Sequence, residues 1–295
     1  MKNRHVFVGF AAVVFAGTFI GCGGSDDSDE NVIVKDTTQT VVEPDQPKVE
    51  YAVPTPNELF EIIKIQGGEQ RPGVVNPLEN RSKYVDLKSK SLNFGVYSAD
   101  LAYMSCFGVG TEFLKYFKAI EEIGTELGIE GAFDQDLMDR IENNEGDTDS
   151  LFAISNESYY DSYLYLEEND KGVELSLIMA GGYIESLYIV CSLVEKFEEG
   201  DPVIEKIGDQ KLVLENLLDF ILEYSDDQMV SEVMDDLISL SEVFETSMEF
   251  EESGTSIDNK EGKLILSGGG SYKMTKNSLE KITAKAKELR EKIIK

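Results

Sequence analysis

Residues 173–197 constrain the fold of this chain more than any other segment, because their apolar residues cover nearly every side of a helix. One face carries Leu175, Ile178, Met179, Gly182, Ile189 and Leu193. A second face carries Leu177, Ala180, Ile184, Leu187, Cys191 and Val194. A helix that is apolar all round is stable only where other elements enclose it. We therefore expect residues 173–197 to form the central helix of a globular domain.

Two consecutive glycines, Gly181 and Gly182, interrupt this central segment. Each costs a helix about 1 kcal/mol relative to alanine. Close approach of a neighbouring backbone would compensate for that cost. Residues 92–107 are the expected neighbour, since they are similarly apolar apart from Asp100.

The rest of the chain from Thr55 onward also shows a helical period. Thr55 and Pro56 suit a helix start, and Asp149 is expected to cap a later helix. Further helices are expected over residues 91–106, 111–127, 134–143, 149–168, 203–224, 226–250 and 275–294, with an irregular connection over 67–90. Residues 255–266 change to a strand–turn–strand pattern. The prediction is an all-α fold: an antiparallel multi-helix bundle of about eight helices, with a small β-hairpin near the C-terminus.

The N-terminal residues 1–21 have the features of a secretory signal peptide. Lys2 and Arg4 precede a short apolar stretch that runs from Val6 to Ile20. Cys22 follows Phe19-Ile20-Gly21, an arrangement that resembles the bacterial lipobox, whose cysteine is lipidated after cleavage. We expect lipidation at Cys22. A secretory signal cleaved without lipidation and an uncleaved anchor are the alternatives.

Residues 22–53 are expected to form a lipidated cysteine and a flexible acidic tether, and residues 54–295 a single helical domain. As a coil the tether would span roughly 30 Å. The acidic run over residues 25–30 resembles the export signal of surface lipoproteins in Bacteroidota, although a solvated linker would have the same composition. The expected location is the outer membrane, exposed at the cell surface or facing the periplasm.

Net charge and the scarcity of histidine exclude several classes of function. Cleavage before Cys22 removes Lys2 and Arg4, leaving 25 basic and 57 acidic side chains, a net charge of −32. Such a chain repels nucleic acid, and its membrane contact should be through lipid alone.

The only histidine, His5, leaves with the signal, which excludes Ser-His-Asp, Cys-His and His-metal sites. Residues 143–149 do not follow the EF-hand order of calcium ligands, so we expect no metal and no cofactor.

Asp100 and Glu185 are anomalous because each lies in a helix that otherwise has the composition of a core. A buried carboxylate must be paired, hydrogen-bonded or neutralised. The candidate partners are Tyr97, Tyr183, Tyr188 and Arg140. The group could be a small pocket that grips a ligand or supplies an acid and a base. The alternative, which we favour, is a buried polar network that fixes helix register.

Three further features of the sequence bear on packing or binding. The first is the tyrosine cluster of residues 159, 160, 163 and 165, either an aromatic platform for a sugar or peptide or a packed helix face. The second is Cys106 and Cys191, either bridged or free among apolar neighbours. The third is charge: residues 198–252 carry a net −16 and residues 273–295 a net +5, which predicts that the C-terminal helix packs on acidic helices.

Residues 95–103, 180–188 and 262–268 together resemble a group of mostly helical lipoproteins from Bacteroidota that have no known activity. The resemblance spans most of the chain from about residue 55 and implies a helical fold and export, but no functional residues. The expected function is a non-catalytic binding or envelope-assembly role. A surface lipoprotein that captures a glycan or peptide is the alternative, and a carboxylate-dependent enzyme using Asp100 and Glu185 is the third interpretation.

Overall fold

The structure is a computed structural model that describes residues 55–295, apart from 67–69, 72, 108–109, 134, 145, 252–255, 261–262 and 268–270. These described residues all belong to one unit, residues 49–295. The expected signal peptide (1–21) and tether (22–53), including Cys22, lie outside the described residues.

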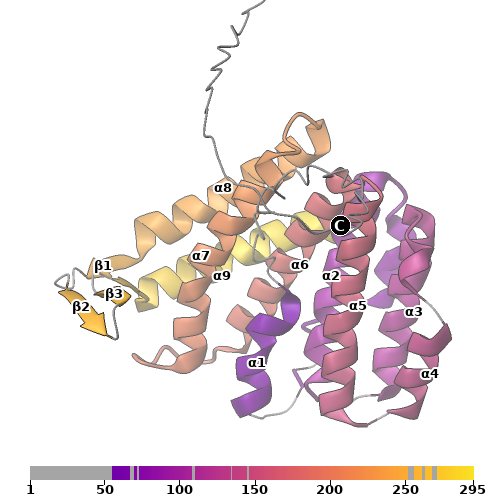
Figure 1. The fold of residues 1–295 in the computed structure, drawn as a ribbon, viewed down its shortest axis with the longest axis horizontal. Coiled ribbons are helices and arrows are strands. Elements are labelled where there is room, and N and C mark those ends of the chain that lie inside the picture. The colour runs from indigo at the N-terminus through magenta and orange to yellow at the C-terminus, as the bar shows by residue number, and fades with distance from the viewer. Residues whose placement is uncertain are drawn as a thin grey trace, which may run out of the picture. The chain divides into compact units, whose positions relative to one another are not determined.

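Helices make up most of the described chain (Figure 1), which confirms the all-α prediction. The α-helices are α1 (Pro56–Gln66), α2 (Leu87–Ser105), α3 (Gly110–Leu127), α4 (Gln135–Asn143), α5 (Thr148–Glu168), α6 (Gly172–Leu193), α7 (Pro202–Leu222), α8 (Gln228–Ser247) and α9 (Lys276–Ile293). Two short 3-10 helices are η1 (Leu78–Lys83) and η2 (Glu130–Ala132). The strands are β1 (Glu249–Glu251), β2 (Ser256–Lys260), β3 (Lys263–Ser267) and β4 (Ser271–Lys273).

Helix α6 is the centre of the domain and packs most extensively against α2, as its apolar composition predicts. It is long and apolar enough to cross a membrane, but 89% of that apolar stretch is buried by the rest of the domain. Glycines allow the α2–α6 contact. A Cβ on Gly95 would lie 2.0 Å from the Ile178 carbonyl oxygen, and one on Gly181 would lie 2.0 Å from the Leu92 carbonyl oxygen. The close backbone approach explains why glycine is tolerated inside both helices.

Short polar side chains begin most of the helices by accepting hydrogen bonds from free backbone N–H groups. Asp86, Asp201 and Asp227 cap α2, α7 and α8, and Thr275 forms a reciprocal capping box with Ser278 at the start of α9. The expected cap of α5 was wrong by two residues. Asp147 accepts from the N–H groups of Asp149 and Ser150, so Asp149 lies inside the helix.

The C-terminal helix α9 packs on α6 and α8. Its apolar stripe, Leu279, Ile282, Ala286 and Leu289, is buried. Lys292 pairs with Asp236 of the acidic helix α8 at 2.6 Å. The predicted docking of the basic helix on acidic neighbours is therefore correct for α8, while the central helix α6 supplies the larger contact.

Two antiparallel strand pairs lie between α8 and α9 (Figure 1). Strands β2 and β3 form the predicted hairpin, with Ile257 opposite Leu266. The pairing of β1 with β4, which places Phe250 opposite Tyr272, was not predicted. The sequence predicts a helix that reaches residue 250, whereas α8 ends at Ser247.

Candidate functional site

Asp100 lies in the middle of α2 and is completely buried. Its Oδ2 accepts a hydrogen bond of 3.0 Å from the backbone N–H of Asn76. It also interacts electrostatically with the carboxyl of Glu185, which is equally buried on the adjacent helix α6. The central helix pair therefore brings the two anomalous acids together.

The cation beside this acid pair is Arg290, from the last turn of α9. Its Nε donates to both oxygens of Glu185, at 3.0 and 2.8 Å, and its Nη2 donates to the Val74 carbonyl oxygen at 3.1 Å. The guanidinium carbon lies 4.3 Å from the centre of the Tyr188 ring, a cation–π distance. Arg290 itself is only 8% exposed, so this is a buried ion pair.

Two carboxyl groups and one guanidinium in a dry site imply one bound proton. Burial, followed by the charge of Glu185, raises the pKa of Asp100 well above its ordinary value. Burial also raises the pKa of Glu185, but Arg290 acts against that rise. Among the described residues, Asp100 Oδ1 has no hydrogen-bond donor facing it. A proton on that oxygen would turn it into a donor, and with Glu185 ionised beside Arg290 the cluster would be neutral.

Polar side chains around the pair continue the network to the end of the chain. Asn76 Nδ2 donates to the Tyr84 hydroxyl at 3.0 Å, and the Tyr116 hydroxyl donates to the Asn76 carbonyl oxygen at 2.8 Å. Asn93 Nδ2 donates to the Ile293 carbonyl oxygen at 3.0 Å. All four of these polar residues are buried, so the network ties the segment before α2 to the C-terminal end of α9.

Two of the three predicted tyrosine partners form hydrogen bonds away from the acids. The Tyr97 hydroxyl donates to the Pro77 carbonyl oxygen at 3.1 Å, and the Tyr183 hydroxyl donates to the Gln210 carbonyl oxygen at 2.9 Å. Tyr188 contributes its ring face to Arg290. Of the three, only Tyr188 therefore contacts the charged cluster directly.

The prediction that Arg140 supplies the cation beside the buried acids was wrong. Arg140 lies on α4 and makes a two-pronged ion pair with Glu157 of α5 on the protein surface, at 3.0 and 2.6 Å. Arg290 takes its place. The sequence held a signal for this, because Arg290 falls four residues after Ala286 on the apolar stripe of α9.

The other candidate features also have defined places. Tyr160 is 48% exposed and stacks on Tyr163 with ring centres 6.1 Å apart, whereas Tyr159 is buried. A Cβ on Gly131 would lie 2.6 Å from the Tyr165 ring, so Tyr165 packs on the η2 turn. Cys106 and Cys191 are both free thiols, and burial raises the pKa of each to about 12.

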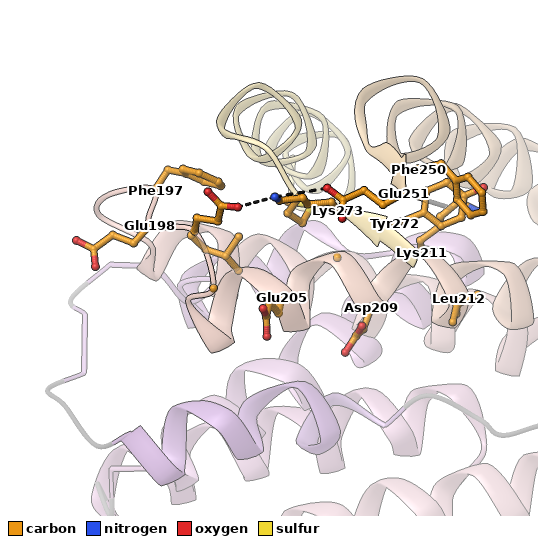
Figure 2. Close-up of a pocket in the computed structure, with 15 residues that line it drawn as sticks. Phe197, Glu198, Glu205, Asp209, Lys211, Leu212, Phe250, Glu251, Tyr272 and Lys273 are labelled. Carbon is orange, nitrogen blue, oxygen red and sulfur yellow. Dashed lines mark ion pairs between the residues drawn. The ribbon is translucent and has the colours of Figure 1, made fainter. Parts of the chain in front are cut away.

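A groove of about 800 Å³ lies on the surface between α7, the turn before it and the β1–β4 strand pair (Figure 2). Sequence reasoning missed this feature. Its apolar lining includes Phe197, Ile204 and Met274. The rings of Phe250 and Tyr272 lie 5.2 Å apart at one end, and these side chains are 52% and 46% exposed.

Charged residues line the same groove. Figure 2 shows Lys273 between two carboxylates; its Nζ lies 2.5 Å from Glu199 and 3.6 Å from Glu251. Lys211 Nζ lies 4.6 Å from the centre of the Tyr272 ring. Its pKa is raised by an ion pair with Glu215 despite the opposing effect of burial.

No group of three or more His, Cys, Asp and Glu side chains that could hold a metal ion occurs within the described part of the chain. Comparisons of the chain with protein-family models, with curated proteins and with solved structures gave no match. The function must therefore be argued from the residues themselves.

Proposed function

We propose that this chain is an exported, lipid-anchored protein of the cell envelope whose helical domain has a non-catalytic binding or assembly role. The observation that carries the proposal is the N-terminal sequence: Lys2 and Arg4 come first, an apolar stretch follows, and Phe19-Ile20-Gly21-Cys22 comes last. The resemblance to helical lipoproteins of Bacteroidota agrees with it. Lipid on Cys22 would hold the acidic domain at a membrane whose anionic surface would otherwise repel it.

The geometry of the acid pair favours a binding role over catalysis. A general acid or base must come within hydrogen-bonding distance of its substrate. Asp100 and Glu185 are 0% exposed; Glu185 is bonded to Arg290, and Asp100 is bonded to the Asn76 backbone. This arrangement supports the interpretation of the pair as a polar network that fixes how α2, α6 and α9 pack.

Capture of a peptide or glycan is the second form of the proposal, and the groove beside α7 favours it. An exposed aromatic pair next to charged groups is a surface on which sugars and peptides can bind. The tyrosine cluster is the weaker candidate, because Tyr160 is its one member that is more than a third exposed.

Replacement of Cys22 tests the anchor. Cys22→Ser should abolish incorporation of radiolabelled palmitate and move the protein from the membrane to the soluble fraction. Cys106→Ser is the matched control, since it removes a thiol of the folded domain and should change neither result. Unchanged labelling of the Cys22 variant would overturn the proposal.

The same cells can show which side of the outer membrane carries the domain. Protease added to intact cells should remove the domain if residues 25–30 direct it to the surface. Replacement of the four acids of that run with alanine should then protect it. Resistance of the wild-type domain, while a known surface protein is cut, would place it in the periplasm.

A further inference from the structure

The groove beside α7 gathers an unusual share of the exposed apolar surface. The large hydrophobic side chains that are exposed in the described chain are Ile65, Val85, Leu87, Tyr160, Leu212, Leu222, Ile238, Phe250 and Tyr272. Three of these nine, Leu212, Phe250 and Tyr272, line this one groove, although they come from a helix and two strands. Exposed apolar residues that line one hollow indicate an interaction site.

The charges of the groove define what it would accept. Lys273 is already neutralised by Glu199 and Glu251, and Glu198 pairs with Lys196 at 3.1 Å. Glu205 and Asp209 differ: no cation of the described residues lies within ion-pair distance of either. Both are exposed, lie one helical turn apart on α7 and contribute to the lining of the groove. Figure 2 shows that their side chains leave α7 on the side away from Phe250 and Tyr272.

The outer side of α7 combines these two features. Leu212 follows Asp209 by three residues, so Glu205, Asp209 and Leu212 share one exposed face. On the inner side, Gly208 leaves space that Met274 fills, because a Cβ there would lie 2.9 Å from the Met274 side chain. The groove thus has an apolar floor, an aromatic end and an acidic outer flank.

We propose, building on the non-catalytic binding role above, that this groove binds a basic peptide segment of another envelope protein. Lysine or arginine side chains of the peptide would pair with Glu205 and Asp209. Its apolar or aromatic side chains would pack on Leu212, Phe250 and Tyr272. A neutral glycan would leave the two acids without a charge partner, and the chain's own residues 22–53 are acidic and would be repelled.

Fluorescence polarisation of the full chain in detergent solution tests this proposal. The probe is a short labelled peptide of alternating lysine with leucine or tyrosine, and the same peptide with glutamate in place of lysine is the comparison. At about 50 mM NaCl the basic peptide should bind and the acidic one should not, and binding should weaken at about 500 mM NaCl.

Substitutions then locate the site. Glu205→Gln with Asp209→Asn should weaken binding about tenfold at low salt and much less at high salt. Phe250→Ala with Tyr272→Ala should weaken it about tenfold at both salt concentrations. The control pair, Glu142→Gln with Glu168→Gln on α4 and α5, removes the same charge from exposed positions and should leave binding unchanged.

Each other outcome overturns the proposal in a defined way. Equal binding by the wild type and by both groove variants would show that the peptide binds to net charge alone. Binding of a neutral oligosaccharide that the aromatic variant abolishes would assign the groove to a glycan. A dimer in sedimentation that the groove variants dissociate would assign it to a second copy. These assays do not depend on lipidation, so failure here leaves the Cys22 result unaffected.

Discussion

Replacement of Asp100 with asparagine tests whether this buried carboxyl holds a proton. Asparagine has nearly the shape of a neutral aspartic acid. Its Oδ1 can accept from the Asn76 N–H, and its Nδ2 can donate to Glu185 as the protonated oxygen would. We therefore expect Asp100→Asn to keep the fold and to lose less than about 1 kcal/mol at pH 4.5.

The pH dependence follows from the raised pKa of Asp100. In the unfolded chain Asp100 loses its proton near the ordinary value of 3.8, whereas in the folded protein burial and Glu185 keep the proton bound to higher pH. Between those two values the folded state binds one more proton than the unfolded state. Stability from this group is complete below pH 3.8 and falls as pH rises toward the folded-state pKa, by at most about 1.4 kcal/mol for each pH unit. Asparagine does not titrate, so the Asp100→Asn variant should not show this loss of stability with rising pH.

Urea unfolding followed by far-ultraviolet circular dichroism measures the effect, since the chain has no tryptophan to report by fluorescence. Curves at pH 4.5, 5.5, 6.5 and 7.5 should show that the free energy of unfolding of the variant increases relative to that of the wild type as pH rises. A variant that is less stable by more than about 2 kcal/mol at pH 7.5, with a deficit that grows with pH, would show that Asp100 is ionised and that the argument is wrong.

Two further predictions use matched pairs of substitutions and the same unfolding assay. Arg290→Met leaves Glu185 buried without its cation and should lower the free energy of unfolding by about 3–5 kcal/mol. Arg140→Met breaks an exposed ion pair and should lower it by less than about 1 kcal/mol. Equal losses would contradict the assignment of the buried cation. Gly181→Ala forces a Cβ to within 2.0 Å of the Leu92 carbonyl oxygen, so it should lower the free energy of unfolding by about 3 kcal/mol or prevent folding. The Cβ of Gly182→Ala meets nothing closer than 3.4 Å, so its free energy of unfolding should stay within about 1 kcal/mol of the wild-type value. Tolerance of both alanines would refute the close α2–α6 crossing.

The central helix pair could be predicted from the sequence because its signals are local. Apolar residues on all sides of residues 173–197 predict burial, and the glycine pair inside them predicts a close neighbour. Asp100 and Glu185 were recognisable for the same reason, as single acids in apolar surroundings. Periodicity along one segment carries all of this information.

The partners of the acids could not be predicted in the same way. Glu185 and Arg290 are 105 residues apart, and Val74 is 216 residues from Arg290. The place of Arg290 on the apolar stripe of α9 indicates that it is buried, but no pattern within one helix shows which acid it meets. The groove was missed for a related reason, because Phe250 and Tyr272 meet only when β1 pairs with β4 across the hairpin between them.

Completion of the buried network by Arg290 also determines when this domain can finish folding. Until Arg290 is synthesised, Glu185 and Asp100 have no cation. Contacts between residues far apart in the sequence form slowly because a long loop must close first. A chain that ends before residue 290 would leave both acids without their cation, and such late completion would suit the export proposed above. A deletion of only the last six residues, 290–295, would for the same reason destabilise residues near position 74 at the other end of the domain.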